Sequence, residues 1–554
     1  MTASVKDPLR PDIEAAGKKD TPSIAYEKPS LAGNLHAGLN DERYEPTKRG
    51  LKSRHAQMIA LGGSIGTGLF LGSGQALAIG GPASLFMSYC IISAVVYGVI
   101  TAYAEIGAYL PTHGGTMGLH GYRYVSSSLG FAMGYLYWYS MGILVPYEIV
   151  AGAVVIDYWQ TDVHVGVWIT VLLIVIVALN FLPVQFYGET EFWFAGIKVI
   201  TLTGLLLVAF ILFWGGGPKR ELLGFHYWKT PAAFAVYSPY TGDAGRLAGF
   251  VKCMMRSAFG FIFSPELLIT TGGEMESPRR NLPTAAKRYM FRLIFFYILG
   301  SLAISVTCPS DHSRLTNGGA GAGSSPFVIG IQNAGIPVLN HIVNAAILTS
   351  AWSSGNSYLY MSSRNLYSLA MAGNAPRIFK ATNRWGVPYV AVGTSALFSF
   401  LAYLSVGTDS SIVFNWLVDF TNTSGFMSWM CGMIVYWRFR KAVKAQGIEL
   451  PYVSKIQPYG SYFAFFGGTF LTLFNGFDVF FPSVWSVANF FSSYFGIPAF
   501  LAFYFGHRIV FRKDPWVWPS NQVDMHSGLE EIIAAERPPR VRDTWWKKCM
   551  AVIE

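Results

Sequence analysis

The sequence is poor in charge. Asp, Glu, Lys and Arg make up only 13% of its 554 residues, whereas 52% are hydrophobic. Soluble domains carry about 25% charged residues, and a soluble chain of this length could not cover its surface with so few. The composition excludes a set of soluble domains and indicates a protein that crosses a membrane several times.

Cysteine is also scarce, and the five cysteines are dispersed, mostly within apolar runs. This excludes a disulfide framework and a cysteine-rich metal site. The ten histidines are scattered without metal-ligand spacing. We therefore expect no metal, no cofactor and no enzyme chemistry. The net charge of +10 comes from Lys and Arg in short loops and tails, so it predicts no nucleic-acid partner.

The chain has long apolar runs instead. About 20 apolar residues are needed for a helix to cross a bilayer, and twelve runs meet this length. They lie near 55–79, 83–110, 128–158, 163–183, 191–214, 248–272, 289–308, 334–356, 388–407, 412–436, 460–481 and 486–508. The sequence predicts an all-α integral membrane protein with twelve transmembrane helices.

Basic residues orient these spans, because cytosolic loops are enriched in Lys and Arg. The loops after spans 6, 8 and 10 are basic, whereas the loops at 80–82, 159–162, 408–411 and 482–485 hold no Lys or Arg. The loop at 215–247, with four basic residues, is an exception. We expect both termini in the cytosol, a disordered tail over 1–50 without a signal peptide, a membrane domain over 51–510 and a second tail over 511–554.

The run "IALGGSIGTGLFLGSG" at 59–74 holds six glycines inside an apolar segment. Two interpretations remain open. The helix unwinds at mid-membrane, which is tolerated only where the backbone lines a cavity or is buried in protein, and its free N–H groups bind an anion. Alternatively, Gly62, Gly66, Gly68 and Gly72 form G-x-x-x-G pairs for close helix packing.

The sixth run, "SAFGFIFSPELLITTGGEMESPRRNLPTAAKR", is interrupted as well. Pro265 lacks a backbone donor, and Glu266 places a carboxyl deep in the run. Spans 1 and 6 would open the two halves of a five-plus-five arrangement. Interrupted segments at matching positions of two halves point to the binding site of a transporter.

Three segments carry a resemblance to a known family: "LKSRHAQMIALGGSIGTGLFLGSG", "GETEFWFAGIKVI" and "GGEMESPRRNLPTAAKR". They resemble the fungal and bacterial amino acid permeases of the amino acid–polyamine–organocation superfamily, from about Leu51 to about Val510. The resemblance implies a LeuT-type 5+5 inverted repeat plus two extra helices, with spans 1 and 6 unwound. "VDMHSGLEEI" near the C-terminus resembles a tail segment of fungal members.

The resemblance also implies a substrate site at span 1. Gly66, Thr67 and Gly68 would hold the α-carboxylate through backbone N–H groups and the Thr67 hydroxyl. The backbone carbonyl of Ser64 would receive the α-ammonium group.

At span 6 the carbonyls of Gly260 and Phe263 would receive the same ammonium group. Relatives often have an aromatic gate at the position of Gly260. The glycine departs from that pattern, so we expect Phe261 or Phe259 to serve as the gate.

Buried ionisable residues are functional candidates, because a charged amine deep in a span costs at least ~2.5 kcal/mol unless it is partnered. Lys198 would replace a sodium ion of related transporters and couple protons; the alternative is a lysine that snorkels to the interface. Glu266 would carry a proton, contact substrate or join spans 6 and 10, or be a structural glutamate. The resemblance implies that Glu148 faces the substrate path, and we expect Glu105 to belong to an inner gate.

These features predict a secondary transporter that imports amino acids across a fungal plasma membrane by proton symport. We expect neutral or broad-range substrates, since small or apolar ones such as proline suit the Phe- and Gly-rich span 6. Alternatives are a transporter of GABA, choline or a polyamine, and an amino acid receptor that does not transport. Ubiquitin ligase machinery would act on lysines of the N-terminal tail, namely Lys6, Lys18, Lys19 and Lys28.

Overall fold

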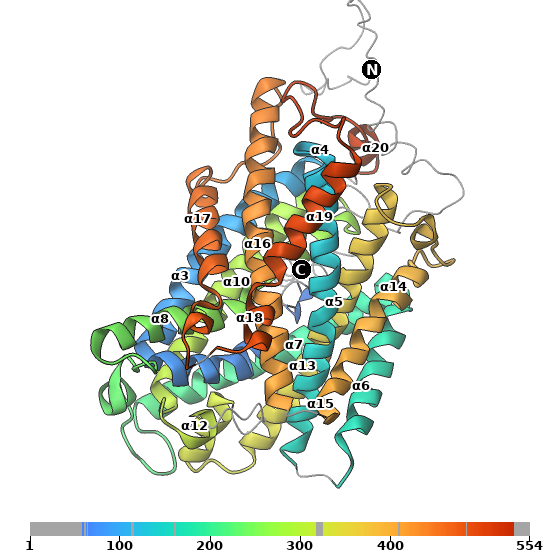
Figure 1. The fold of residues 1–554 in the computed structure, drawn as a ribbon. Coiled ribbons are helices and arrows are strands. Elements are labelled where there is room, and N and C mark those ends of the chain that lie inside the picture. The colour runs from blue at the N-terminus through green and yellow to red at the C-terminus, as the bar shows by residue number, and fades with distance from the viewer. Residues whose placement is uncertain are drawn as a thin grey trace, which may run out of the picture.

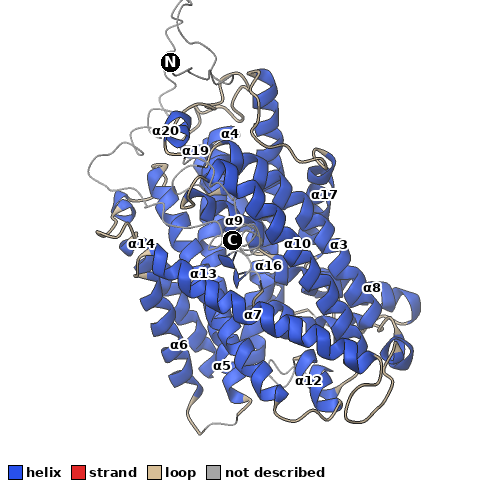
Figure 2. Cartoon of the chain, turned by 180° about the vertical axis from the view of Figure 1, so that it is seen from behind, coloured by secondary structure: helices blue, strands red, loops and turns tan. Residues whose placement is uncertain are grey.

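The structure is a computed structural model. It describes residues 58–59, 62–63, 65–111, 116–159, 162–316, 325–407, 410–483 and 485–536. These residues form helices and no β-strand (Figures 1 and 2). The predicted tail over 1–50 with its four lysines, Ser64, and the end of the second tail lie outside the described residues.

The described residues of the first half of the chain form four long helices and three shorter elements. They are η1 (Gly68–Gly72), α3 (Ser73–Tyr109), α4 (Met117–Tyr124), α5 (Ser127–Asp157), α6 (Val165–Asn180), α7 (Val184–Phe213) and η2 (Trp228–Ala232).

The second half begins with a helix that is interrupted before its end. The elements are α8 (Gly242–Ala258), η3 (Phe259–Phe261), α9 (Ser264–Gly273), α10 (Pro278–Thr307), α11 (Ser313–Thr316), α12 (Pro326–Asn333), α13 (Leu339–Met371), η5 (Arg377–Lys380), α14 (Tyr389–Ala396), η6 (Leu397–Tyr403), α15 (Leu404–Gly407), α16 (Ser410–Ala445), α17 (Tyr459–Phe474), η7 (Phe477–Phe480), α18 (Val487–Tyr494), α19 (Gly496–Val510) and α20 (Leu529–Ala534).

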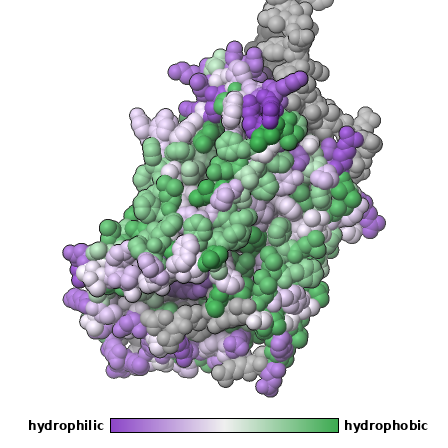
Figure 3. Space-filling model, viewed as in Figure 1, coloured by the Kyte–Doolittle hydropathy of each residue, from purple (hydrophilic) through white to green (hydrophobic). Residues whose placement is uncertain are grey.

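Seven helical segments of the described residues are long and apolar enough to cross a membrane, or eight if α18 and α19, bent by 51°, form one span. Hydrophobic residues cover the middle of the visible face, and hydrophilic ones gather at its two ends (Figure 3). All twelve predicted runs overlap helices, but spans 1 and 2 are continuous through a kink at Gly81, where φ is +81°.

Two long helices, α13 and α16, are absent from the segments that are apolar enough to cross a membrane. For α13, burial explains why. Most of α13 is buried between its neighbours, including a run of Ser and Asn side chains. Because these side chains pack against protein instead of lipid, they lower the hydropathy of α13 without exposing polar groups. For the same reason the predicted run at 334–356 ends too early: α13 continues to Met371.

The long helices pack in two groups. In one group α3 lies against α8 and α10; in the other α5 lies against α13, α16 and α19. Helix α7 contacts both α10 and α13. The segments around η1 and η3 contact each other, and η1 is hydrogen-bonded onward to Ser325 through the Phe70 carbonyl at 2.8 Å.

Residues 511–536 fold back onto the end of the molecule that carries α4 and α20, which we call the α4 end (Figure 1). The Trp518 amide donates to the Val125 carbonyl at 2.8 Å. Met525 is fully buried, and its carbonyl accepts from the Tyr109 hydroxyl at 3.0 Å. The described part of the second tail is therefore a docked segment of the fold.

Asp524 adds an electrostatic contact to this docked segment. Burial alone would raise its pKa, but Arg123 and the amides of Ser527 and His526 lower it below its ordinary value. A lowered carboxylate pKa contributes stability that is complete at neutral pH and is lost only as pH falls through the folded-state pKa.

Candidate functional site

Two interruptions of helical geometry lie next to each other. The first precedes η1, in the glycine-rich run; the second separates α8 from α9, where Phe263 has a left-handed φ of +57°. A Cβ built on Gly68 would lie 3.0 Å from the Gly260 Cα. The backbones thus approach so closely that a side chain at position 68 would push against backbone, which cannot rotate away. We call residues 62–68 the first break and residues 259–263 the second break.

The first break contacts α5 through Glu148. The Thr67 hydroxyl lies 2.9 Å from Glu148 Oε2 and 3.1 Å from the Tyr147 hydroxyl. A Cβ on Gly66 would lie 2.6 Å from Glu148 Oε1. Three predicted site residues, Gly66, Thr67 and Glu148, are therefore in one buried cluster.

Lys198 connects the first break to two other helices. Its Nζ donates to the Gly62 carbonyl and to Ser354 Oγ on α13 at 3.2 Å. Lys198 is only 2% exposed, so its amine does not snorkel to an interface. The Ser350 hydroxyl of α13 also donates to the Ile65 carbonyl at 2.9 Å. Backbone carbonyls that lack helical partners are thus bonded by side chains, as buried polar groups must be.

Glu191 is a buried carboxylate that the sequence analysis missed. It is fully buried and accepts from Ser353 Oγ at 2.7 Å and from Asn356 Nδ2 at 3.0 Å. A signal was available, because Glu191 precedes Lys198 by seven residues within "GETEFWFAGIKVI", and that spacing puts both on one helix face. The first break is therefore flanked by Glu148, Glu191 and Lys198.

In the second break, backbone carbonyls accept hydrogen bonds from nearby donors. The Gly260 carbonyl accepts from the Tyr297 hydroxyl of α10 at 2.7 Å, and the Phe263 carbonyl accepts from the Leu267 amide at 3.0 Å. The two carbonyls that the resemblance assigns to a substrate amine are thus already engaged in this structure.

The aromatic rings of the second break pack in two directions. The Phe259 ring lies 4.8 Å from Tyr147 of α5, next to the Thr67–Glu148 cluster. The Phe261 ring lies 4.3 Å from Tyr297 of α10. Of the two predicted gate candidates, Phe259 is therefore the one that contacts α5.

Glu266, on α9, belongs to a second polar cluster. Its Oε1 accepts from the Tyr103 hydroxyl of α3 at 3.1 Å and from Ser428 Oγ of α16 at 3.0 Å. Its Oε2 is buried without a hydrogen-bond partner among the described residues. Glu266 thus joins three helices, including the predicted pair of spans 6 and 10.

Glu105 lies apart from both breaks. Its carboxylate accepts from the Tyr436 hydroxyl at 2.8 Å and from the Ser454 amide at 2.7 Å, and it pairs with Arg440 at 3.3 Å. These contacts link α3 to α16 near the α4 end; the inner-gate role expected for Glu105 stays a prediction.

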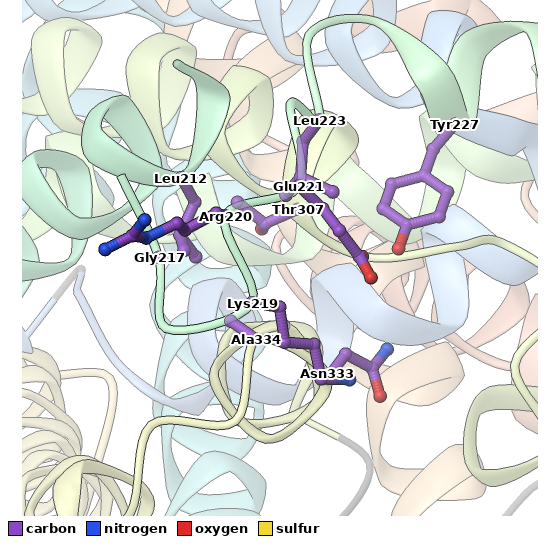
Figure 4. Close-up of a pocket in the computed structure, with 11 residues that line it drawn as sticks. Leu212, Gly217, Lys219, Arg220, Glu221, Leu223, Tyr227, Thr307, Asn333 and Ala334 are labelled. Carbon is purple, nitrogen blue, oxygen red and sulfur yellow. The ribbon is translucent and has the colours of Figure 1, made fainter. Parts of the chain in front are cut away.

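A small cavity at the opposite end carries no site. It lies between the ends of α7, α10 and α12, with Glu221 extending toward Tyr227 (Figure 4). Its volume is about 30 Å³, and none of the residues that line it belongs to either break.

Comparison with known proteins assigns the chain to a family. A family model described as "Amino acid permease" matches residues 55–518. The chain belongs to the amino acid permease family. The permease is 45% identical to the "Proline-specific permease" of Emericella nidulans over 97% of this chain and 99% of that one. It is 47% identical to the "Proline-specific permease" of Saccharomyces cerevisiae, covering 89% and 80%.

More distant matches widen this comparison. The permease is 40% identical to the "Dicarboxylic amino acid permease" of Saccharomyces cerevisiae, covering 90% of this chain and 82% of that one. Among solved structures, the Eremococcus coleocola manganese transporter has a TM-score of 0.51 at 12% identity, covering 87% of this permease and 96% of that chain. At that identity the likeness concerns the fold alone.

Membership settles several expectations from the sequence. The chain is a fungal-type amino acid permease of the amino acid–polyamine–organocation superfamily: a multi-pass membrane transporter, not an enzyme. Its substrates are amino acids, and secondary transporters of this kind are energised by ion gradients without a cofactor.

Proposed function

We propose that this permease imports proline, or a small neutral amino acid close to it, across the plasma membrane by proton symport. The two relatives at 45% and 47% identity are named proline-specific. Gly68 and Gly260 are in backbone contact, so the substrate would lie beside this contact and not between the two residues. This narrows the neutral or broad range expected from the sequence.

The observation that carries the proposal is the contact between the two breaks beside a buried lysine. In this account spans 1 and 6 of a twelve-helix, 5+5 repeat are unwound and bind the zwitterion between them. Amides of Gly66, Thr67 and Gly68 hold its carboxylate, which the positive end of a half-helix favours. Carbonyls of Ser64, Gly260 and Phe263 and the ring of Phe261 are the remaining proposed contacts.

Protons would be carried by buried ionisable groups. Lys198 lies near two buried carboxyl groups, those of Glu148 and Glu191. Glu266 has one side-chain oxygen, Oε2, without a hydrogen-bond partner among the described residues. Symport requires that these groups bind protons with different affinity in the outward- and inward-open states. Glu148, beside Thr67, is proposed to sense the substrate. Losing Lys198 or Glu266 would then uncouple accumulation from the proton gradient.

The two packing groups supply a route for alternating access. Helices α3, α8, α9 and α10 would rock against α5, α13 and α16, carrying the breaks with them. With both termini in the cytosol, the α4 end and its docked segment would face the cytosol. The domains would be an N-terminal tail over 1–50, a membrane domain over 51–510 and a C-terminal tail over 511–554. Ubiquitin ligase machinery would act on the tails.

Uptake of labelled L-proline in a proline permease-deficient yeast tests this function. We expect accumulation above the external concentration, abolished by a protonophore. Labelled GABA, choline and a polyamine in the same cells test the amine alternatives. Binding of proline without accumulation would support a receptor and contradict transport.

A further inference from the structure

Gly260 and Tyr297 fit each other closely. Tyr297 is fully buried, and its ring lies 4.3 Å from Phe261 and 5.7 Å from Tyr89. A Cβ built on Gly260 would lie only 2.8 Å from Tyr297 Cε1. The tyrosine ring therefore fills the space beside position 260 that a side chain there would need.

The same tyrosine engages the backbone of the second break. Its hydroxyl donates to the Gly260 carbonyl at 2.7 Å. A carbonyl oxygen has two lone pairs, so this bond uses one of them and directs the carbonyl toward α10. The proposed function assigns this Gly260 carbonyl to the substrate amine, next to the contact of Gly260 with Gly68. The bond thus removes acceptor capacity from the amine subsite.

Acceptor capacity is limited elsewhere in the second break too. The Phe261 carbonyl accepts from Ser264 Oγ at 2.7 Å, and the Phe263 carbonyl from the Leu267 amide at 3.0 Å. A primary ammonium group brings three N–H donors to this subsite, whereas the secondary ammonium group of proline brings two. A buried donor left without an acceptor weakens binding, so a subsite short of acceptors favours the two-donor amine.

We propose that Tyr297 is a specificity-determining residue: by holding the Gly260 carbonyl, it favours secondary over primary amino groups. This inference rests on the proposed function and names the chemical feature by which the site would recognise its substrate. The selectivity comes from a hydrogen bond made behind the site, and Tyr297 itself need not touch the substrate.

The test compares two inhibitors of labelled L-proline uptake, N-methyl-L-alanine and L-alanine. They share one side chain and differ by one N–H donor. In the wild type, N-methyl-L-alanine should inhibit at the lower concentration. Tyr297→Phe keeps the ring and frees the carbonyl, so the ratio of inhibition constants should move toward L-alanine by about tenfold, or about 1.4 kcal/mol.

Tyr109→Phe is the matched control, because Tyr109 is also a buried tyrosine that donates to a backbone carbonyl, that of Met525. It should leave the ratio unchanged. Gly260→Ala gives a second route, since its Cβ would displace the Tyr297 ring and should shift the ratio in the same direction. All variants are compared at equal surface level.

An unchanged ratio in Tyr297→Phe, with proline uptake intact, would overturn this inference and leave the proposed function standing. So would an equal loss of affinity for both inhibitors, which would mark Tyr297 as structural only. Wild-type cells that take up no proline would instead overturn the proposed function, and this inference with it.

Discussion

The two breaks interrupt their helices by different means. The first is made of glycines, and its carbonyls at Gly62 and Ile65 are bonded by Lys198 and by serines of α13. The second contains Phe263 with φ of +57°, and aromatic residues surround it. The first break is thus held by Lys198 of α7 and by hydroxyl groups of α13, and the second by aromatic rings and a tyrosine of α10.

This difference suggests a division of labour. A break bonded to Lys198 and lying beside two carboxylates can change its partners when a proton moves. A break packed between rings changes mainly by a shift of side-chain packing. We infer that the first break couples protons to substrate binding. We infer that the second break determines which substrate shapes and which amino groups are accepted.

The largest expected effect comes from placing a side chain at the contact between the two breaks. Gly68→Ala should lower proline uptake about tenfold, because its Cβ would push against the backbone of Gly260, which cannot rotate away as a side chain would. Gly72→Ala is the matched control, since a Cβ there meets nothing within 4 Å. Initial uptake rates at equal surface level measure both; similar rates in the two variants would refute the tight contact.

The second-largest effect is expected from removing the positive charge of Lys198 at the first break. Lys198→Met should lower accumulation at least about fivefold, since it leaves the Gly62 carbonyl with one donor fewer and buried carboxylates without a cation. Accumulation of labelled proline with and without a protonophore measures this. Lys229→Met, at an exposed lysine, serves as control. Full protonophore-sensitive accumulation in Lys198→Met would move the coupling role away from the first break.

Glu266 lies on α9, just after the second break, so its substitution tests whether a proton site lies there as well. Glu266→Gln preserves the shape and the bonds to Tyr103 and Ser428, so we expect surface expression to persist while accumulation falls a few-fold, about two to five times, through loss of a proton site. Uptake at external pH 5 and 7 separates this from a folding defect. If the pH dependence matches that of the wild type, Glu266 is structural. Glu221→Gln, on the exposed loop, is the control.

The smallest effect is expected far from both breaks, in the docked segment 511–536. Asp524→Asn should weaken docking by about 1 kcal/mol at neutral pH, where the lowered pKa keeps the native carboxylate charged beside Arg123. Faster protease cleavage within 511–536, with proline uptake within about twofold of wild type, would agree. Loss of uptake equal to that of Gly68→Ala would show that the segment controls the site.

Sequence reasoning reached the first break more fully than the second. Glycines in an apolar run and a lysine deep in a span are local signals, and the structure brings Gly66, Thr67, Glu148 and Lys198 into the same region. Glu191 was missed although its spacing from Lys198 was visible. Tyr297 could not have been found, because its bond to Gly260 joins residues on separate helices and no local pattern marks it.

The helices show the same contrast between local and tertiary signals. The apolar run at 128–158 matched α5, but the runs at 191–214 and 289–308 began after the starts of α7 and α10. The run over 334–356 stopped short of Met371 because the Ser-rich half of α13 looks polar until its neighbours are known. The docking of residues 511–536 was likewise invisible, since Met525 is buried only by contact with distant residues.

The central claim is that substrate binds beside the contact of Gly68 with Gly260 and that a proton gradient drives its accumulation. The most direct measurement is protonophore-sensitive accumulation of labelled L-proline in yeast expressing the wild type, Gly68→Ala or Gly72→Ala at equal surface level. The account predicts accumulation in the wild type and Gly72→Ala and its loss in Gly68→Ala. Undiminished accumulation in Gly68→Ala, or accumulation in the wild type that survives the protonophore, would contradict it.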